Sequence, residues 1–451
     1  MQNIKRTFWG GLVLVTLLWL LADPSVWQSA GFFSVRQWAL QYSGVVAMAA
    51  MSVAMMLALR PRWPERWFGG LDKMYRLHKW LGIAALIVSV VHWLWVQGAK
   101  WAVGYGWLAR PERGERAPIE NPVEAFLATM RGAAEGLGEL AFYLTVILVV
   151  VALLRFVPYR LFRKTHRLLA PVYLLLVFHT VVLTSFGYWT TPLGVVLALL
   201  LAGGTFAAIV AMLRRIGAGR RTMGRITGLQ YYPAVQSLEM EIDVGEGWPG
   251  HKAGQFAFAM ADRSEGAHPF TIASAWNGDS RRITLVAKEL GDYTRRLRET
   301  LSVGGDLTLE GPYGCFTFDD DRPRQIWIGG GIGVTPFIAG MKRLAIERQS
   351  AADGLRDKAI DLFHTTTDYD EAAITKLTSD AAAAGIRFHV LVDARDGLLT
   401  GERVRREVPD WRDASIWFCG PPAFGAALRA DFAANGLPVA DRFHQELFEM
   451  R

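Results

Sequence analysis

The sequence predicts a multi-domain membrane protein in which a six-helix transmembrane bundle is followed by an antiparallel β-barrel and then by a doubly wound α/β domain. Long apolar runs are confined to about the first 215 of the 451 residues. Short strands that alternate apolar and polar residues follow them, as in a small barrel. From Arg324 onward, strands alternate with helices, which is typical of a parallel sheet. We place the domain boundaries at residues 1–220, 221–320 and 321–451.

Six apolar runs are candidate spans, because a helix that crosses a bilayer needs about 20 mostly apolar residues. The runs are Phe8–Leu21, Trp38–Leu59, Trp80–Val96, Leu140–Phe156, Leu168–Phe186 and Leu193–Leu213. The first run is short, and Lys5 and Arg6 before it also fit a secretory signal peptide. We favour a retained helix, since no small-x-small cleavage site follows.

Basic residues predict the orientation of the bundle. They fill the loops after the second, fourth and sixth spans: Arg60, Arg62, Arg66, Lys73 and Arg76; Arg155, Arg160, Arg163, Lys164 and Arg167; and Arg214, Arg215, Arg220 and Arg221. The loop after the third span balances its basic residues with glutamates. The positive-inside rule therefore places the N-terminus and the C-terminal half in the cytoplasm. We assign the net charge of +7 to this topology and expect no nucleic-acid partner.

Four histidines lie in or beside two of the spans. His78 and His92 flank and enter the third span, and His166 and His179 do the same for the fifth. An ionisable side chain within a membrane is costly and usually has a partner. Because imidazole is a common axial ligand of haem iron, the two pairs indicate two metal cofactors stacked across the membrane. The alternative is that they are hydrogen-bonded packing or interfacial histidines.

The spacing of the histidines predicts how they pair. His78 and His92 are 14 residues apart, so an ideal helix holds them on nearly one face, about 21 Å apart along its axis. His166 and His179 are 13 apart and fall well over ~100° out of phase. Pro171 between them offers a distortion that would realign them. Equal depth pairs His78 with His166 near the cytoplasm and His92 with His179 near the outer face.

Four short motifs stand out in the soluble half, and two of them suit a bound phosphate. The first is His268-Pro269-Phe270-Thr271 with Ser274 after it, and the second is Gly291-Asp292-Tyr293-Thr294 before a helix, where free amides suit a diphosphate. The third is the strand-to-helix loop from Gly329 to Pro336, whose glycines let amides approach a pyrophosphate. The fourth is Cys419-Gly420-Pro421 at the end of a later strand. Each taken alone is also read as a strand end, a helix cap or tight packing.

The order of these motifs resembles one family. The segments HPFT…S, GDYT, GPYG, GGGIGVTPF, FCGPP and a terminal E-x-F succeed one another as in the ferredoxin-reductase module. The HPFT variant resembles the form in NADPH oxidases and ferric reductases, and the preceding spans resemble their ferric-reductase-like transmembrane domain. The resemblance covers nearly the whole chain. It implies a bacterial transmembrane flavocytochrome of the inner membrane that ends in a Rossmann-like nucleotide-binding domain.

The resemblance implies two b-type haems, FAD, and NADPH or NADH as cofactors, with these residue roles. His78, His92, His166 and His179 would be the axial haem ligands. His268, Pro269, Phe270, Thr271 and Ser274 would line the flavin, and Gly291, Asp292, Tyr293 and Thr294 its diphosphate. Gly330, Gly331, Gly333, Val334, Thr335, Gly420 and Pro421 would bind the nicotinamide dinucleotide. Thr271 near the flavin nitrogen, Cys419 near the nicotinamide, the acid Glu446 and the flavin-stacking Phe448 would be the catalytic set.

The chain also departs from the family pattern. Members specific for NADPH carry an arginine after the second strand of the nucleotide domain, whereas this chain has the stretch from His364 to Asp368 without arginine. An acid there favours a free ribose 2′-hydroxyl, so NADH or dual use stays open. The animal oxidases carry a further histidine where this chain has Val96, which places an oxygen-reducing pocket in doubt. No calcium-binding loop is present.

These observations predict a conduit that carries electrons from cytoplasmic NAD(P)H to an acceptor on the outer side of the lipid membrane. We favour dioxygen, which would give superoxide, slightly over ferric chelates, and a periplasmic redox protein is a third candidate. A haem transporter or sensor is the rival from another class, but it would not need both nucleotide motifs. The two cysteines, Cys315 and Cys419, exclude a disulfide framework and a cysteine-ligated metal cluster.

Overall fold

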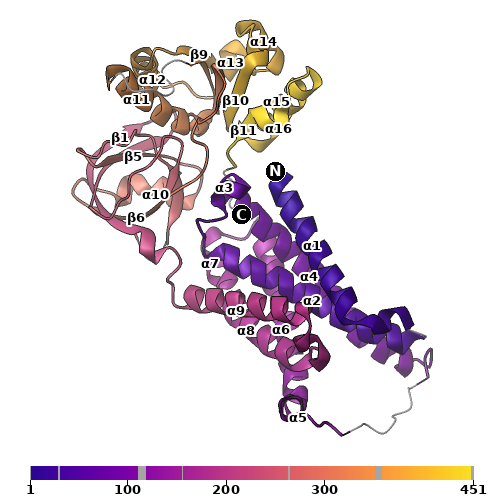
Figure 1. The fold of residues 1–451 in the computed structure, drawn as a ribbon. Coiled ribbons are helices and arrows are strands. Elements are labelled where there is room, and N and C mark those ends of the chain that lie inside the picture. Colours follow the sequence, from indigo (N-terminus) through magenta and orange to yellow (C-terminus); the bar gives the residue numbers. More distant parts are fainter. Residues whose placement is uncertain are drawn as a thin grey trace. The chain divides into compact units, whose positions relative to one another are not determined.

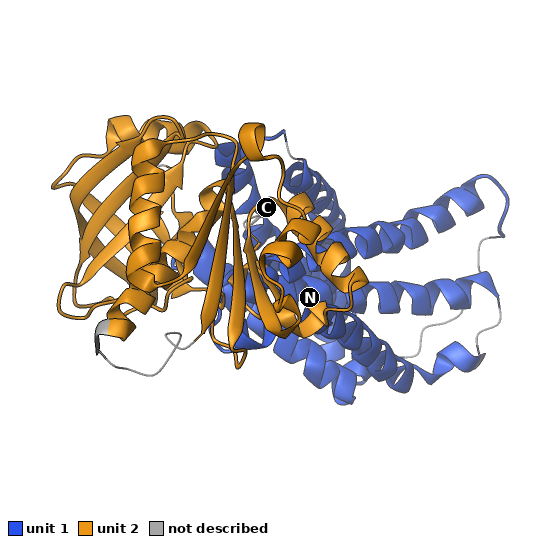
Figure 2. Ribbon diagram, turned by 90° about the horizontal axis from the view of Figure 1, so that it is seen from above, with its two compact units in different colours: residues 1–68, 73–216, 451 blue, residues 69–72, 217–450 orange. Residues whose placement is uncertain are grey.

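A computed structural model describes residues 2–28, 31–109, 118–154, 156–262, 265–350 and 358–447 (Figure 1). The chain forms two compact units, coloured separately in Figure 2. The first consists mainly of residues 1–68 and 73–216, and the second of residues 69–72 and 217–450. The finer division at residues 220 and 320 stays a prediction.

The first unit is helical. Its helices are α1 (Gln2–Ala22), α2 (Phe32–Ala58), α3 (Glu65–Phe68), α4 (Leu71–Gly104), α5 (Pro122–Thr129), α6 (Arg131–Leu153), α7 (Tyr159–His166), α8 (Leu169–Leu183) and α9 (Pro192–Met212). Within the described residues, six helical segments are long and apolar enough to cross a membrane when α7 and α8 count as one. The predicted six-span bundle is therefore confirmed.

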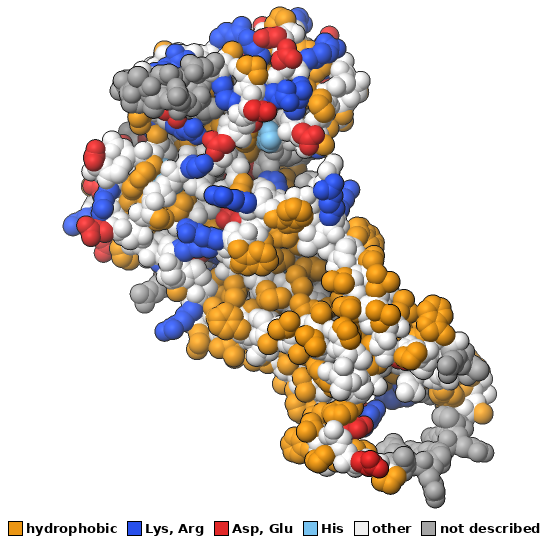
Figure 3. Space-filling model, viewed as in Figure 1, with side chains coloured by type: hydrophobic (Ala, Val, Ile, Leu, Met, Phe, Trp, Pro, Cys, Tyr) orange, Lys and Arg blue, Asp and Glu red, His pale blue; other side chains and the backbone are white. Residues whose placement is uncertain are grey.

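Apolar side chains cover both the inside and the outside of this helical unit. Val45, Ala141, Tyr173 and Leu197 belong to its buried core. Many apolar side chains also face outward, among them Val13, Leu14, Leu17, Ile87, Ile147, Leu199 and Phe206. Hydrophobic atoms cover much of the visible surface of these helices (Figure 3). An apolar exterior of this extent suits lipid, since soluble proteins rarely expose large apolar patches.

The fifth span is interrupted, and the interruption lies before Pro171. Helix α7 ends at His166, and α8 begins at Leu169 after a two-residue turn. Pro171 has no N–H to donate to the Arg167 carbonyl, which instead accepts from the Ala170 N–H at 3.2 Å. A distortion between the two histidines was expected, and the chain breaks directly after His166, so that His166 lies on one helix and His179 on the next. The phase of an ideal helix therefore does not relate them.

The second unit begins with an antiparallel sheet of strand order β4-β3-β6-β1-β2-β5. The strands are β1 (Arg221–Tyr232), β2 (Ser237–Val244), β3 (Phe256–Met260), β4 (His268–Thr271), β5 (Arg282–Lys288) and β6 (Asp306–Tyr313), with α10 (Asp292–Thr300) after β5. An isolated bridge between Ile272 and Leu285 links the two edges. Closing the edges in this way is what a barrel requires.

A parallel sheet of strand order β11-β10-β7-β8-β9 follows. Its strands are β7 (Arg324–Gly330), β8 (Ala359–Thr366), β9 (Arg387–Val392), β10 (Ala414–Cys419) and β11 (Phe443–Gln445). The helices between them are α11 (Thr335–Ser350), α12 (Glu371–Ala384), α13 (Asp393–Asp396), α14 (Gly401–Glu407), α15 (Pro422–Ala434) and α16 (Val439–Arg442). The strand order reverses between β7 and β10, the place where open α/β sheets bind ligands. The doubly wound prediction is confirmed.

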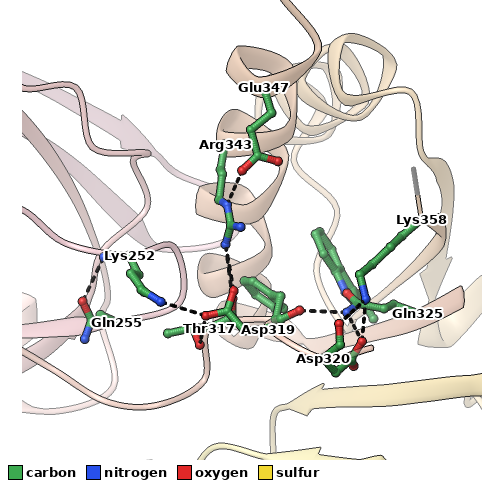
Figure 4. Close-up of polar contacts among 11 residues, drawn as sticks. Lys252, Gln255, Thr317, Asp319, Asp320, Gln325, Arg343, Glu347 and Lys358 are labelled. Carbon is green, nitrogen blue, oxygen red and sulfur yellow. Dashed lines mark hydrogen bonds and ion pairs between the residues drawn. The ribbon is translucent and has the colours of Figure 1, made fainter. Parts of the chain in front are cut away.

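Two adjacent aspartates fix the segment that joins the two sheets (Figure 4). Asp319 accepts from Lys252 of the barrel at 3.0 Å and from Arg343 of α11 at 3.4 Å. Asp320 accepts from Lys358, just before β8, at 2.7 Å. Because these partners belong to the barrel and to the α/β domain, the two aspartates tie the connecting segment to both parts of this unit.

A buried aspartate organises the core of the parallel sheet. Asp361 on β8 is fully buried and accepts from Arg324 at 2.8 Å, Arg387 at 2.8 Å and His389 at 3.1 Å. Burial alone would raise the pKa of the Asp361 carboxyl, but the hydrogen bonds from His389 and Arg387 outweigh burial and lower it. The carboxylate is thus stabilised as an anion in the folded state.

We expect Asp361→Asn to lower the free energy of unfolding by about 3 kcal/mol at pH 7, because it breaks a buried ion pair. The native pKa lies below the unfolded value of about 3.9. The stabilisation is therefore complete above that value and is lost as the pH falls through the native pKa. Urea unfolding in detergent, followed by circular dichroism, should show the deficit at pH 7 and a smaller one at about pH 3.5. An equal loss of unfolding free energy at both pH values would contradict this prediction. Asp321→Asn, on a side chain that is 91% exposed, is the control.

Candidate functional site

The helical unit brings the four histidines together in two pairs. The ring centroids of His78 and His166 are 5.9 Å apart, and those of His92 and His179 are 6.3 Å apart. These are the pairs that equal depth predicted. Two imidazole–metal bonds of about 2 Å each on opposite sides of one metal put the two nitrogens about 4 Å apart, with the ring centroids somewhat farther. Both separations leave room for one metal between the rings.

Hydrogen bonds fix the tautomer of three of the rings. His78 Nδ1 lies 2.9 Å from the carbonyl oxygen of Ala54, and His179 Nδ1 lies 2.9 Å from that of Ala134. A carbonyl only accepts, so both Nδ1 atoms carry the proton and Nε2 keeps its lone pair. Histidines that bind metals usually donate their second N–H in this way.

His92 is held by a hydroxyl. Ser43 Oγ donates to the Ala39 carbonyl at 2.6 Å, and its oxygen lies 3.0 Å from His92 Nδ1. Since a hydroxyl has one proton, Ser43 accepts from the His92 Nδ1–H. Nε2 of His92 is then the nitrogen that remains for a metal.

His166 differs from the other three. Its Nδ1 is buried and has no hydrogen-bond partner among the described residues. Its ring stacks on Phe162 of the same helix, with centroids 5.1 Å apart. The His166 ring is therefore positioned by packing rather than by a bond to its Nδ1.

A glycine makes room for the His179 ring. A Cβ at Gly138 of α6 would lie 1.9 Å from His179 Nδ1, so a side chain cannot occupy that position while the ring stays in place. On α2, a Cβ at Gly44 would lie at an ordinary 3.5 Å from His92 Cε1. Within the outer pair, the His179 ring therefore depends on the absence of a side chain at Gly138, whereas the His92 ring would tolerate a Cβ at Gly44.

The donor set fits haem better than a bare ion. Each pair offers two imidazoles, and no group of three or more His, Cys, Asp or Glu side chains in the described part of the chain is placed to hold a metal ion. A structural zinc site needs four protein ligands. Haem iron needs only axial ligands from the protein, because the macrocycle supplies the others.

Sequence reasoning missed Ser43, Gly138 and Arg36. Arg36 donates from Nε to the Trp95 carbonyl at 2.9 Å and lies close enough to His92 for an electrostatic interaction. A charged side chain in an apolar helix was a signal that could have found Arg36. A serine and a glycine in small-residue helices give no such signal, because such residues serve helix packing in general.

In the second unit, the segments predicted for the flavin and its diphosphate meet. The His268 ring stacks on the Tyr293 ring with centroids 3.8 Å apart and planes within 11°. Thr271 is buried, and its hydroxyl has no hydrogen-bond partner among the described residues. A buried hydroxyl left unbonded is costly, so it marks a place where a ligand group would bond. Ser274 instead accepts from the Thr284 N–H at 3.0 Å, within the barrel wall.

The segment from Gly291 to Thr294 forms the start of α10. Thr294 Oγ1 accepts from the Gly291 N–H at 3.1 Å and from the Leu290 N–H at 3.0 Å. The Gly291 amide is thus used within the chain. The amides of the first turn of α10 remain as the donors that a helix start offers to an anion.

The glycine-rich loop and the Cys419 segment also lie together. Gly329 pairs with Cys419 across β7 and β10. A Cβ at Gly333 would lie 2.2 Å from the Cys419 carbonyl, and one at Gly330 would lie 2.9 Å from Pro421 Cδ. The loop bends with Gly331 at a φ of 55° and leads into α11 at Thr335. These glycines permit a close approach of two backbones at the switch point of the sheet.

Of the two C-terminal residues in the predicted catalytic set, Glu446 is described by the structure and lies near Cys419. Glu446 is buried, and its N–H donates to the Phe418 carbonyl at 3.3 Å. Burial, and then the charge of Glu446, raise the pKa of the Cys419 thiol well above its usual value. Cys419 is therefore a neutral thiol, suited to contact rather than to nucleophilic attack. Phe448 lies outside the described residues.

Comparison with known proteins agrees with this arrangement. Residues 43–177, which include His78, His92 and His166, match the family described as "Ferric reductase like transmembrane component". Residues 223–317 match the family described as "FAD-binding domain".

Three curated relatives match parts of the chain. An NADPH oxidoreductase of Mycobacterium tuberculosis is 28% identical over 40% of this chain and 47% of its own length. The reductase component of propane 2-monooxygenase of Rhodococcus jostii is 26% identical over 44% of this chain and 57% of its own length. Ferric reduction oxidase 5 of Arabidopsis thaliana is 38% identical over 20% of this chain and 13% of its own length. The chain thus spans about half the length of the first two. It is a ferric-reductase-like transmembrane component fused to an FAD-binding module of the ferredoxin-reductase type.

Proposed function

We propose that this chain is a transmembrane oxidoreductase that carries electrons from cytoplasmic NAD(P)H to an acceptor on the outer side of a bacterial inner membrane. The observation that carries the proposal is the pair of histidine pairs at two depths of a membrane-type bundle, in a chain that continues into an FAD-binding module. A haem transporter would use the first feature and not the second.

The bundle would hold one b-type haem at each histidine pair. His78 and His166 would ligate the inner group, and His92 and His179 the outer group. The carbonyls of Ala54 and Ala134 and the hydroxyl of Ser43 keep Nδ1 protonated, so that Nε2 is presented as the ligand. With both imidazoles of a pair committed as ligands, each level would suit electron transfer more than substrate binding.

The second unit would hold FAD and the dinucleotide. When bound, FAD would accept a hydride from the nicotinamide and release single electrons, the conversion that links a two-electron donor to one-electron carriers. The Thr271 hydroxyl would bond the flavin at a buried point, and the start of α10 would face its diphosphate. The loop from Gly330 to Thr335 would hold the dinucleotide pyrophosphate beside Cys419, Gly420 and Pro421.

For the acceptor we propose dioxygen, reduced to superoxide at the outer level. A ferric chelate is the second candidate, supported by the similarity of part of the chain to ferric reduction oxidase 5. Arg36 is a cation close enough to His92 to act on it electrostatically, and it would stabilise superoxide as it forms or attract an anionic chelate to the outer level. A periplasmic redox protein would need a docking surface on the same side.

Anaerobic reduction of the purified protein tests the conduit. We expect NADH or NADPH, added to the full chain in detergent with FAD, to bleach the flavin and then raise the absorption bands of reduced haem, equivalent to two haems per chain. A bleached flavin with oxidised haems would overturn the conduit, and absence of haem would overturn the ligand assignment.

A second stage of the same experiment identifies the acceptor. Admitting dioxygen with a superoxide probe, or a ferric chelate with a ferrous indicator, should reoxidise the haems at different rates. The acceptor that reoxidises the haems faster at equal concentration is the one to be assigned. Superoxide formed more slowly than ferrous iron would replace dioxygen by the chelate in this proposal.

A further inference from the structure

The second unit contains a pocket at the carboxyl edge of its parallel sheet. The pocket is lined by Gly331 and Thr335 of the glycine-rich loop, by Thr366 and Asp368 at the end of β8, and by Lys288 of the barrel. The end of the second strand of a dinucleotide-binding sheet is where an acid meets the ribose of the adenosine half. Asp368 occupies that place.

The two oxygens of the Asp368 carboxylate differ in their contacts. The Thr367 hydroxyl donates to Oδ2 at 3.2 Å, and Lys288 Nζ lies 4.0 Å from the same oxygen. The structure records no bond from a described residue to Oδ1, and the side chain is 53% exposed. Just before it, the Thr366 hydroxyl donates to the Asp368 carbonyl at 2.7 Å and shapes the turn. Oδ1 is therefore positioned to accept from a ligand hydroxyl.

The charges around the pocket disfavour a further phosphate. Four acids line it, namely Glu239, Asp368, Asp370 and Asp380, against three lysines, Lys288, Lys342 and Lys376. Lys376 bonds to Glu239, Lys288 lies near Asp368, and Lys342 interacts with Asp380. None of the described residues that line the pocket is an arginine. A 2′-phosphate carries nearly two negative charges at pH 7 and is best held by an arginine fork.

We propose that Asp368 accepts a hydrogen bond from the adenosine ribose 2′-hydroxyl through Oδ1, and that the chain therefore uses NADH in preference to NADPH. This inference rests on the proposed function, because it names the donor for the same site. The 2′-phosphate of NADPH would lie against the Asp368 carboxylate, and the described lining of the pocket offers no arginine to balance it. Repulsion of a doubly charged group by one carboxylate at contact distance in water is worth roughly 10- to 30-fold in affinity.

Stopped-flow flavin reduction in the full chain tests this preference. Under anaerobic conditions we expect the second-order rate constant of flavin reduction by NADH to exceed that by NADPH by about 10-fold or more in the wild type. Asp368→Asn should lower this ratio about 10-fold, because it removes the charge and keeps the size of the side chain. Asp368→Glu, which keeps the charge, should still prefer NADH. Asp321→Asn removes an exposed acid elsewhere in the same unit and should leave the ratio unchanged.

Calorimetric binding of ADP-ribose and of its 2′-phosphate gives a readout that needs no turnover. Tighter binding of ADP-ribose to the wild type, and equal binding to Asp368→Asn, would support the inference. Equal use or preference for NADPH in the wild type would overturn it, as would an unchanged ratio in Asp368→Asn. If neither dinucleotide reduces the flavin, the proposed function fails, and the binding measurement still decides the preference.

Discussion

Replacing His92 with alanine should remove the outer haem and reduce electron transfer to the outer acceptor about 100-fold or more, while NADH still reduces the flavin. The His92 ring faces His179 at 6.3 Å, and no further histidine, cysteine or acid joins the pair to form a larger donor group in the described structure. With His92 removed, His179 would be the one protein ligand left at this level. Even partners that only orient a ligand are worth about 10- to 100-fold in metal affinity, so the ligand itself is worth more.

Haem content per chain and the reduced absorption spectrum measure this effect. Ser43→Ala should give an intermediate result, because it keeps the imidazole and removes its Nδ1 partner. Gln97→Ala, on the same helix α4, alters a surface bond to Glu139 and should keep both haems. Two haems in His92→Ala would refute the assignment of the outer pair.

Gly138→Ala should also empty the outer level, although it leaves all four histidines in place. The new Cβ would lie 1.9 Å from His179 Nδ1, which forces the ring away and breaks its 2.9 Å bond to the Ala134 carbonyl. We expect outer-haem affinity to fall by about 10- to 100-fold, the range for lost orienting contacts. The inner level should be unaffected, since its histidines do not contact Gly138.

Gly136→Ala is the matched control for this effect. It lies on the same helix, and a Cβ there would meet nothing within 4 Å. Alanine is a better helix former than glycine by up to about 1 kcal/mol, so both substitutions favour the helix itself. Spectra taken during haem titration of the purified variants should separate them. Equal haem affinity in the two variants would show that the His179 ring has room to move.

Hydropathy and histidine depth were sufficient to predict the bundle and its pairs. The six spans, the pairing of His78 with His166, and the pairing of His92 with His179 all follow from the positions of residues along the chain. These features depend on burial and length, which sequence reports directly. The roles of the paired residues as haem ligands remain predictions.

Other features depend on contacts between helices, which sequence does not report. Gly138 matters because it faces a ring 41 residues away in the chain, and Ser43 because it meets His92. The break after His166 depends on local hydrogen bonds before Pro171, where the Arg167 carbonyl accepts from Ala170. The sequence signalled that the 13-residue spacing was abnormal, and only the structure shows how the chain accommodates it.

In the second unit, the motifs predicted where the nucleotides would bind, and the structure adds the contacts around those motifs. The parallel, doubly wound sheet and its glycine-rich strand-to-helix loop were predicted from alternation and composition, whereas the strand order comes from the structure. The acid at Asp368 was visible in sequence, but the bond from Lys376 to Glu239 and the approach of Lys288 to Asp368 were not. Charge balance in a pocket depends on which side chains meet there.

Helix α2 supplies the Nδ1 partner at both depths, with Ala54 serving His78 and Ser43 serving His92. The two residues are eleven apart, or about 16 Å along one continuous helix. A hydrogen-bonded helix resists stretching, so in the proposed conduit one covalent segment would set the distance that an electron tunnels between the two levels. Tunnelling rates fall steeply with distance. The step between the levels should therefore keep its rate when lipid or detergent changes the packing of the other helices.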